Sequence, residues 1–248
     1  MKVVALLPAR LNSSRIKKKC LKKLRGIPLI IHTLYRSSQI RNLDEIYVCT
    51  DSKEIKALVE KYNFRAFMTS KKHVNGTERI SEIAKKIKAD LFIDIHSDEA
   101  LLEPKSVEEL IRFHKKNMKF DIIVPHKKSK IDGGINVVKL IMNKLNEVIY
   151  FTRLACPYGF RKKNKIFYHH VDTISFKPKV LRKFSSLKIG NLEKIEGIEL
   201  LRAIENKITV GTYDAKTNSF SINTPEDFRQ AEKILFKDKI FKKFFEKF

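Results

Sequence analysis

The chain has 248 residues, 43% of them hydrophobic, with only 8 glycines and 7 prolines. This length and composition exclude a disordered or fibrous chain and fit one large α/β domain or two small ones. The 52 Lys and Arg residues outnumber the 28 acidic residues, giving a net charge of +24 at pH 7. Such a field attracts phosphates, acidic lipids and acidic substrates. Because the excess is spread along the whole chain without a recognition motif, we do not expect nucleic-acid binding as the main function.

The three cysteines, Cys20, Cys49 and Cys156, are widely spaced and form no CxxC or Cys/His cluster. This pattern argues against a disulfide framework and against a structural zinc site. The first ten residues turn polar too soon for a signal peptide, and no apolar run reaches the length of a membrane span. We therefore expect a reduced, soluble, cytoplasmic protein.

Strand and helix signals alternate over the first 120 residues. The apolar run "KVVALLPA" (2–9) predicts a buried parallel strand that ends in a loop. Ser52 is a predicted helix cap, as is Thr77, whose helix carries Ile80 and Ile83 on one face. We expect strands over 2–9, 45–51, 65–69 and 90–96, and helices over 27–40, 53–62, 77–88 and 105–116. This alternation predicts βαβ units around a mainly parallel sheet.

The pattern changes after about residue 120. We expect strands over 120–126, 135–142, 147–153, 168–177 and 207–214, and helices over 191–206 and 224–236. No internal repeat, low-complexity linker or clear boundary interrupts the chain. We therefore predict a single domain over 1–236, with a smaller mixed-sheet insertion at roughly 125–190.

The basic C-terminal tail (237–248) places Phe241, Phe244, Phe245 and Phe248 at helical spacing. One interpretation is a helix that lies on a membrane surface. The other, which we favour, is a terminal helix that docks on its own domain or on a partner subunit.

Three loops that follow predicted strands carry the candidate functional residues, because ligands of open α/β sheets bind outside the carboxyl ends of the strands. The first loop, "PARLNSSR" with Lys19, offers hydroxyl groups, backbone N–H groups and cations to a phosphate chain. The second, "HVNGTER" (73–79), begins a helix, where an anion or a base edge can bind, although an ordinary capped helix fits equally well. In the third, Asp98 and Glu99 could hold Mg²⁺ or could simply be solvated.

Eight ordered motifs resemble those of the 3-deoxy-manno-octulosonate (KDO) cytidylyltransferases. They are "PARLNSSR" with Lys19, "NGTER" (75–79), "HSDE" (96–99), "NVVK" (136–139), "IYFTR" (149–153), His170, "LEKIEGIELLR" (192–202) and "NTPEDF" (223–228). The resemblance extends to about residue 235. It implies a mononucleotide-binding, nucleotide-diphospho-sugar transferase-like three-layer sandwich that acts as a homodimer. It also implies the reaction of CTP with an acid sugar to give CMP-sugar and pyrophosphate, for lipopolysaccharide or capsule synthesis.

The resemblance also assigns roles to residues of this chain. The implied catalytic residues are Arg10, Arg15, Lys19 and Asp98. The implied nucleotide-binding residues are Pro8, Ala9, Arg10, Ser13, Ser14, Arg15, Lys19, Asn75, Gly76 and Thr77. The implied sugar-binding residues are Arg79, His96, Lys139, Arg153, His170, Glu196 and Glu199, and the implied Mg²⁺ ligands are Asp98 and Asn223. The implied partners are thus CTP, an acidic sugar and a second copy of the chain. Nucleic acid and a membrane span are not expected.

The departures from the family pattern fall at ligand positions. His96 and Ser97 replace a Gln-Gly pair, Leu200 replaces a Gln, and "DTI" (172–174) replaces a "GIY" run. Most importantly, Asn223 stands where the family has a metal-binding Asp. An Asn oxygen can bind Mg²⁺ but adds no charge. The sequence leaves open whether Asp172 or Asp227 compensates.

Three interpretations follow from these departures. The sugar could be an amino or deoxy variant of KDO, because a site built for one set of hydroxyls discriminates against others. Alternatively, the sequence could have drifted while KDO was retained. The chain could also be a weakened or inactive homologue that binds a nucleotide or a protein partner.

Overall fold

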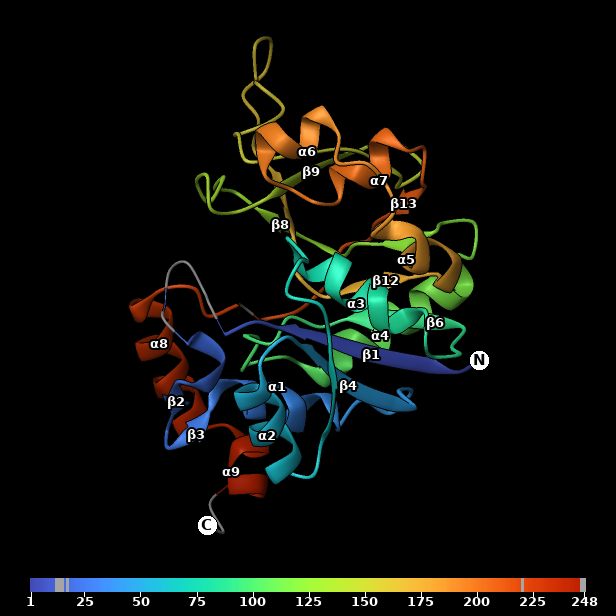
Figure 1. Ribbon diagram of the computed structural model, residues 1–248. Coiled ribbons are helices and arrows are strands. Elements are labelled where there is room, and N and C mark those ends of the chain that lie inside the picture. The colour runs from blue at the N-terminus through green and yellow to red at the C-terminus, as the bar shows by residue number, and fades with distance from the viewer. Residues whose placement is uncertain (12–15, 17, 220, 246–248) are drawn as a thin grey trace.

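The computed structural model describes residues 1–11, 16, 18–219 and 221–245 (Figure 1). A seven-stranded sheet forms its centre, with the strand order β13-β7-β12-β6-β1-β4-β5. These strands are β1 (Val3–Ala9), β4 (Glu45–Thr50), β5 (Arg65–Met68), β6 (Leu91–Asp94), β7 (Ile122–Ile123), β12 (Ile174–Phe176) and β13 (Val210–Gly211). Only the pairings of β12 are antiparallel. The predicted mainly parallel sheet is therefore confirmed.

Helices cover both faces of this sheet. They are α1 (Leu29–Ser37), α2 (Lys53–Lys61), α3 (Gly76–Ala84), α4 (Pro104–Lys116), α5 (Pro178–Phe184), α6 (Asn191–Glu196), α7 (Leu201–Glu205), α8 (Pro225–Phe236) and α9 (Lys239–Phe245). Alternate residues of β1 point to opposite faces. Val3, Ala5 and Leu7 pack with α1, α2, α4, α8 and α9, whereas Val4 and Leu6 pack with α3, α5 and α7. The result is the expected three-layer arrangement. No described helix is long and apolar enough to cross a membrane.

A second, antiparallel sheet lies beyond the α3 and α5 face, at the top of Figure 1. Its strands, in the order β10-β9-β11-β8, are β8 (His126–Ser129), β9 (Lys139–Met142), β10 (Val148–Thr152) and β11 (Phe167–His170). The prediction of one strand over 168–177 is wrong. That segment forms the end of β11 in the small sheet and all of β12 in the central sheet, so residues 171–173 cross between the two sheets.

The predicted helix over 191–206 is also interrupted. It forms α6 and α7, which are separated at Gly197, where φ is +63°. A positive φ ends a helix and favours glycine. The break places residues 197–200 in an irregular segment beside the small sheet.

Helix starts agree closely with the sequence signals, with one exception. Ser52 accepts from the Ile55 N–H group as predicted. The cap of α3 is Asn75, however, which accepts from the Glu78 N–H group at 2.8 Å, and not Thr77. Asn at this position satisfies a backbone donor that the first helical turn leaves free. Ile27 and Pro28 form the short strand β3 (Ile27–Pro28), which pairs with β2 (Lys23–Leu24), and a 3₁₀ turn covers Lys19–Leu21.

The C-terminal helix α9 packs against α1 of its own chain. Phe241 stacks on His32 with ring centroids 5.7 Å apart, and Phe245 meets Tyr35 edge-on at 4.9 Å. Both phenylalanines are buried. This confirms the predicted docking for the described part of the tail, whereas Phe248 lies outside the described residues.

Candidate active site

A cavity of about 620 Å³ opens at the carboxyl ends of β1 and β6, between the central sheet and the segment that follows α6. The three predicted loops reach it, and so do the segments that carry Arg153, His170 and Glu199, three of the residues implied to bind the sugar. The predicted site residues that line it are Pro8, Ala9, Arg10, Lys19, Asn75, Gly76, Arg79, His96, Asp98, Arg153, His170, Glu199 and Asn223. Ser13, Ser14 and Arg15 lie outside the described residues. The strand-end rule therefore brings together residues that are more than 200 positions apart in the sequence.

The first two loops touch at the mouth of the cavity. A Cβ atom added at Gly76 would come within 3.2 Å of the Pro8 Cγ atom. Gly76 therefore lets the start of α3 approach the loop that leaves β1. Asn75 and Gly76 at this helix start line the same cavity as Arg10, and a helix start suits an anionic or hydrogen-bonding ligand.

A cation position lies deeper in the cavity. The ammonium group of Lys19 contacts the Asp98 carboxylate, the Ile222 carbonyl at 2.9 Å and the Asn223 side-chain oxygen at 3.3 Å. The other Asp98 oxygen, Oδ1, is buried and has no partner among the described residues. Asp98 and Asn223 therefore present oxygen atoms to one shared point, which is occupied by the Lys19 cation.

The two carboxylates considered as compensation for Asn223 have other partners. Asp227 accepts from the backbone N–H groups of Asn223 at 2.8 Å and Thr224 at 2.7 Å, which completes the capping box of α8. Asp172 accepts from the hydroxyl group of Ser221. Among the described residues, no group of three or more His, Cys, Asp and Glu side chains could hold a metal ion.

Several acids, some of them buried beneath the cavity surface, surround His96, which lines the cavity. Burial raises the pKa of Asp94 to about 7 and, with the nearby charge of Asp172, that of Glu99 to about 8. Burial alone would lower the pKa of His96, but the carboxylates of Asp172, Asp94 and Asp98 raise it to about 10. His96 is therefore an imidazolium at neutral pH and offsets part of the negative charge around it.

Two predicted sugar-binding residues do not line the cavity. The ammonium group of Lys139 is enclosed by backbone carbonyls, including those of Gly134 and Val137 at 2.8 Å each. Glu196 accepts from the Thr152 hydroxyl at 2.8 Å and from the Arg153 N–H group at 3.0 Å. These contacts hold the wall around Arg153, so the structure places both residues behind the cavity surface. The sequence alone does not distinguish a lysine that donates to backbone carbonyls in this way from a lysine that binds a ligand.

Thr77 and Arg79 are likewise engaged by neighbouring groups. The Thr77 hydroxyl donates to Glu199 at 2.7 Å, which leaves Oε2 of Glu199 buried without a described partner. Arg79 reaches the cavity, but its guanidinium group donates to Thr69 at 2.6 Å and to Asp51 at 3.0 Å.

Several cavity residues were not predicted. Ile189, Glu193, Lys194 and Ile198 line the wall beside Glu199. A continuous helix over 191–206 would not have brought all of them there. The glycine in the middle of that segment, Gly197, was the sequence signal for the break.

Comparison with known proteins agrees with this geometry. A family model described as cytidylyltransferase matches residues 4–234. The 3-deoxy-manno-octulosonate cytidylyltransferase of a Nitratiruptor species is 34% identical over 239 residues, covering 93% of this chain and 99% of that protein. The 8-amino-3,8-dideoxy-manno-octulosonate cytidylyltransferase of Shewanella baltica is 33% identical over 250 residues, covering 95% and 99%.

A solved structure of a CMP:2-keto-3-deoxy-manno-octonic acid synthetase in complex with CTP has a TM-score of 0.90 at 26% identity and covers 96% of this chain and 99% of that one. The fold and the length thus agree over nearly the whole chain. The chain belongs to the cytidylyltransferase family.

Proposed function

We propose that this protein joins CTP to a KDO-like 2-keto acid sugar, giving the CMP-sugar and pyrophosphate for lipopolysaccharide or capsule synthesis. The observation that carries the proposal is that residues implied to bind the nucleotide and residues implied to bind the sugar line one cavity. The full-length similarity to KDO and amino-KDO cytidylyltransferases supports it.

The reaction requires positioning and charge neutralisation. The anomeric hydroxyl of the sugar attacks the α-phosphorus of CTP in line, and pyrophosphate leaves. Arg10 and Lys19 line the cavity, where they would neutralise the triphosphate and the departing pyrophosphate. Arg15, outside the described residues, is predicted to share this task. The N-terminus of α3 would receive the nucleotide beside the first loop.

Asp98 and Asn223 are the residues that would hold Mg²⁺. The fit rests on the oxygen atoms that already surround a cation, the Lys19 ammonium, and on the unpartnered Oδ1 atom of Asp98. Mg²⁺ in such sites is commonly bound by one or two carboxylates together with substrate phosphates, so one carboxylate and one amide oxygen are sufficient. When bound, Mg²⁺ supplies positive charge to the phosphate oxygens.

We also propose that the protein is a cytoplasmic homodimer. The loop between β10 and β11 exposes Leu154, Tyr158 and Phe160, the last two at 85% and 87% of their surface. Exposed aromatic side chains so close in sequence are typical of protein interfaces. The three free cysteines suit a reducing compartment. Light scattering after size-exclusion chromatography would test the dimer: a mass near 58 kDa, about twice 29.0 kDa, is expected, whereas a monomer mass would refute it.

An inactive nucleotide-binding homologue is the second candidate, because Asn223 adds no charge to the cation position. A screen for pyrophosphate release, combined with a measurement of CTP binding, distinguishes the active enzyme from the inactive homologue. Pyrophosphate release is measured with CTP or UTP against KDO, 8-amino-KDO and a nonulosonic acid, with and without Mg²⁺. Release that requires CTP, an octulosonic acid and Mg²⁺ supports the proposal. CTP binding without release under any condition supports the inactive homologue.

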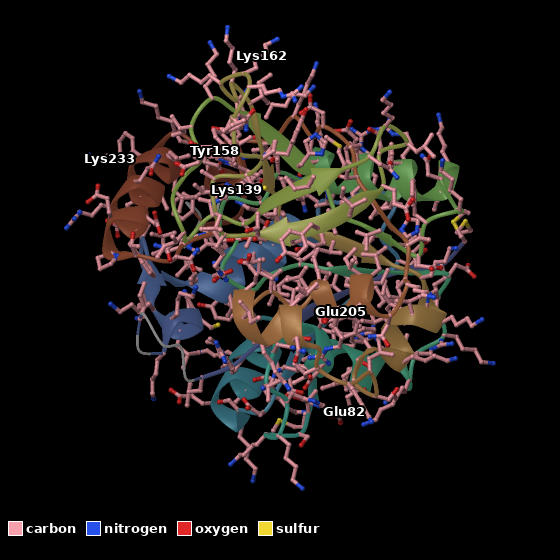
Figure 2. All side chains as sticks on the ribbon, turned by 90° about the horizontal axis from the view of Figure 1, so that it is seen from above. Glu82, Lys139, Tyr158, Lys162, Glu205 and Lys233 are labelled. Carbon is pink, nitrogen blue, oxygen red and sulfur yellow. The ribbon has the colours of Figure 1, made fainter. Side chains whose placement is uncertain are left out.

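The basic surface does not favour a nucleic-acid function. Nitrogen-tipped side chains project around the outline of the molecule, with Lys162 and Lys233 on different sides of it (Figure 2). A nucleic-acid interface instead gathers its basic groups along one face.

A further inference from the structure

His170 and Asp172 form a pair at the edge of the cavity, where the chain crosses between the two sheets. The Nδ1 atom of His170 lies 3.4 Å from Oδ1 of Asp172. The Nε2 atom of the same ring is buried and has no partner among the described residues. The side chain of His170 is only 10% exposed and lines the cavity. A buried polar atom without a partner in a ligand cavity indicates a ligand.

Asp172 is held in its charged form. The hydroxyl group of Ser221 donates to its Oδ2 atom. Burial would raise the pKa of Asp172, but the contact with His170 and the charge of His96 bring it below its usual range. An ionised carboxylate beside Nδ1 favours the tautomer that carries its proton on Nδ1, which leaves a lone pair on Nε2.

The pair is connected to the cation position through Ser221. The Ser221 carbonyl accepts from Nδ2 of Asn223 at 3.4 Å, and Oδ1 of Asn223 lies 3.3 Å from the Lys19 ammonium. The Ser221 hydroxyl contacts Asp172. One short segment therefore contacts the Asp172 carboxylate on one side and the expected phosphate and metal position on the other.

We propose that Nε2 of His170 accepts the proton of the attacking sugar hydroxyl, and that Asp172 is the residue that positions the imidazole. This inference rests on the proposed function. In the step, the hydroxyl oxygen forms a bond to the α-phosphorus while the bond from that phosphorus to the bridging oxygen breaks. The electron pair of the broken bond leaves with pyrophosphate, and the hydroxyl proton moves to Nε2.

The composition of the cavity favours a base of this kind. The cation position has a single carboxylate, Asp98, and that carboxylate is already paired with Lys19. Of the other acids that line the cavity, Glu193 is paired with Arg202 and Glu199 accepts from the Thr77 hydroxyl. Among the described cavity residues, His170 combines an unpartnered ring nitrogen with a carboxylate that orients it, which is the arrangement of a general base.

Chemical rescue of His170→Ala provides the main test. With CTP, KDO and Mg²⁺, kcat should fall by about 10²–10⁴-fold, the usual contribution of a general base. Added imidazole should restore part of kcat in proportion to its unprotonated fraction. His169→Ala is the matched control, because His169 is the neighbour on β11 and its Nε2 atom contacts the Ile131 carbonyl at 2.9 Å. It should keep its kcat and show no response to imidazole.

Asp172→Asn tests the positioning role. The change keeps the size of the side chain but removes the charge that fixes the tautomer. We expect kcat to fall by about 10²-fold or more, with the KM for the sugar changed by less than about threefold. Asp172→Glu should recover part of kcat. Unfolding midpoints near that of the wild type, measured by circular dichroism, verify that the variants fold, and His170→Gln replaces His170→Ala if the latter does not.

The outcomes distinguish failure of the base role of His170 from failure of the proposed function. Wild-type turnover together with an unrescued His170→Ala whose only change is a raised KM would overturn the base and leave the proposed function in place. A wild-type enzyme that releases no pyrophosphate with any sugar of the screen would overturn the proposed function, and this inference with it.

Discussion

The ammonium group of Lys19 contacts the carboxylate of Asp98 at the point where a divalent cation would bind. The two side chains are only 12% and 15% exposed, so solvent screens their attraction weakly. Lys19 also reaches the Ile222 carbonyl and the Asn223 side chain, which uses all three of its N–H bonds. The Lys19 ammonium thus lies at the position proposed for the metal, and a divalent ion would have to displace it.

The first prediction concerns this competition. Lys19→Met removes the internal cation and leaves the oxygen atoms of Asp98 and Asn223 free. Binding of Mn²⁺ to the nucleotide-free protein, measured by electron paramagnetic resonance, should become about tenfold tighter, which corresponds to about 1.4 kcal/mol. Lys18→Met is the control, because Lys18 pairs with Glu54 on the surface. Equal Mn²⁺ affinity in the wild type and Lys19→Met would show that Lys19 does not compete.

The second prediction concerns Asn223. Asn223→Asp adds a second negative charge to the cation position while the backbone contact with Asp227 is kept. Because ligand charge tunes the affinity of such sites, the Mg²⁺ concentration that gives half-maximal pyrophosphate release should fall by about tenfold. Asn218→Asp adds the same charge at an exposed position and should leave the Mg²⁺ requirement unchanged. An unchanged requirement in Asn223→Asp would remove this residue from the metal site.

The central sheet and the nucleotide side of the cavity could be predicted from local patterns. Each strand of the central sheet up to residue 94 is a short, mainly apolar run. The loops after β1 and β6 carry Arg10 and Asp98, which line the cavity as the strand-end rule leads one to expect. The sugar side depends on tertiary contacts instead. Alternation of side chains over 168–177 does not reveal that the chain changes sheets there. Nor does the sequence reveal that the Lys139 ammonium donates to backbone carbonyls.

The third prediction concerns the buried ion network behind α6. Arg202, 1% exposed, donates to both oxygens of Glu193 at 2.6 and 2.7 Å and to Glu78 at 2.9 Å. Arg202→Met leaves the buried carboxylate of Glu193 and the partly buried one of Glu78 without their shared cation, so the free energy of unfolding should fall by about 3–5 kcal/mol. Because Glu193 lines the cavity, we also expect a higher KM for the sugar.

Urea unfolding measures this loss, and Arg229→Met is the control. Arg229 pairs with Glu226 where both side chains are more than two-thirds exposed, so its loss should cost about 1 kcal/mol or less. Losses of similar size in the two variants would contradict a structural role for the buried network.

The fourth prediction concerns Asp94, which is fully buried with both oxygens unpartnered among the described residues. Burial raises its pKa from 3.8 to about 7. Between about pH 4 and 7 the folded protein therefore holds a proton that the unfolded chain has released. The contribution of Asp94 to the free energy of unfolding therefore falls as the pH rises through this window. Above about pH 7 the buried Asp94 carboxylate is charged, and the loss of folding stability that it causes is complete.

Asp94→Asn removes this titration while it keeps the shape of the side chain. The variant should be more stable than the wild type at pH 8, by on the order of 2 kcal/mol, and the difference should shrink as the pH falls toward 5. Urea unfolding at several pH values measures it, with the partly exposed Asp132→Asn as the control that should follow the wild type. A stability difference that does not change with pH would mean that Asp94 is already ionised in the folded protein, with a partner for its charge.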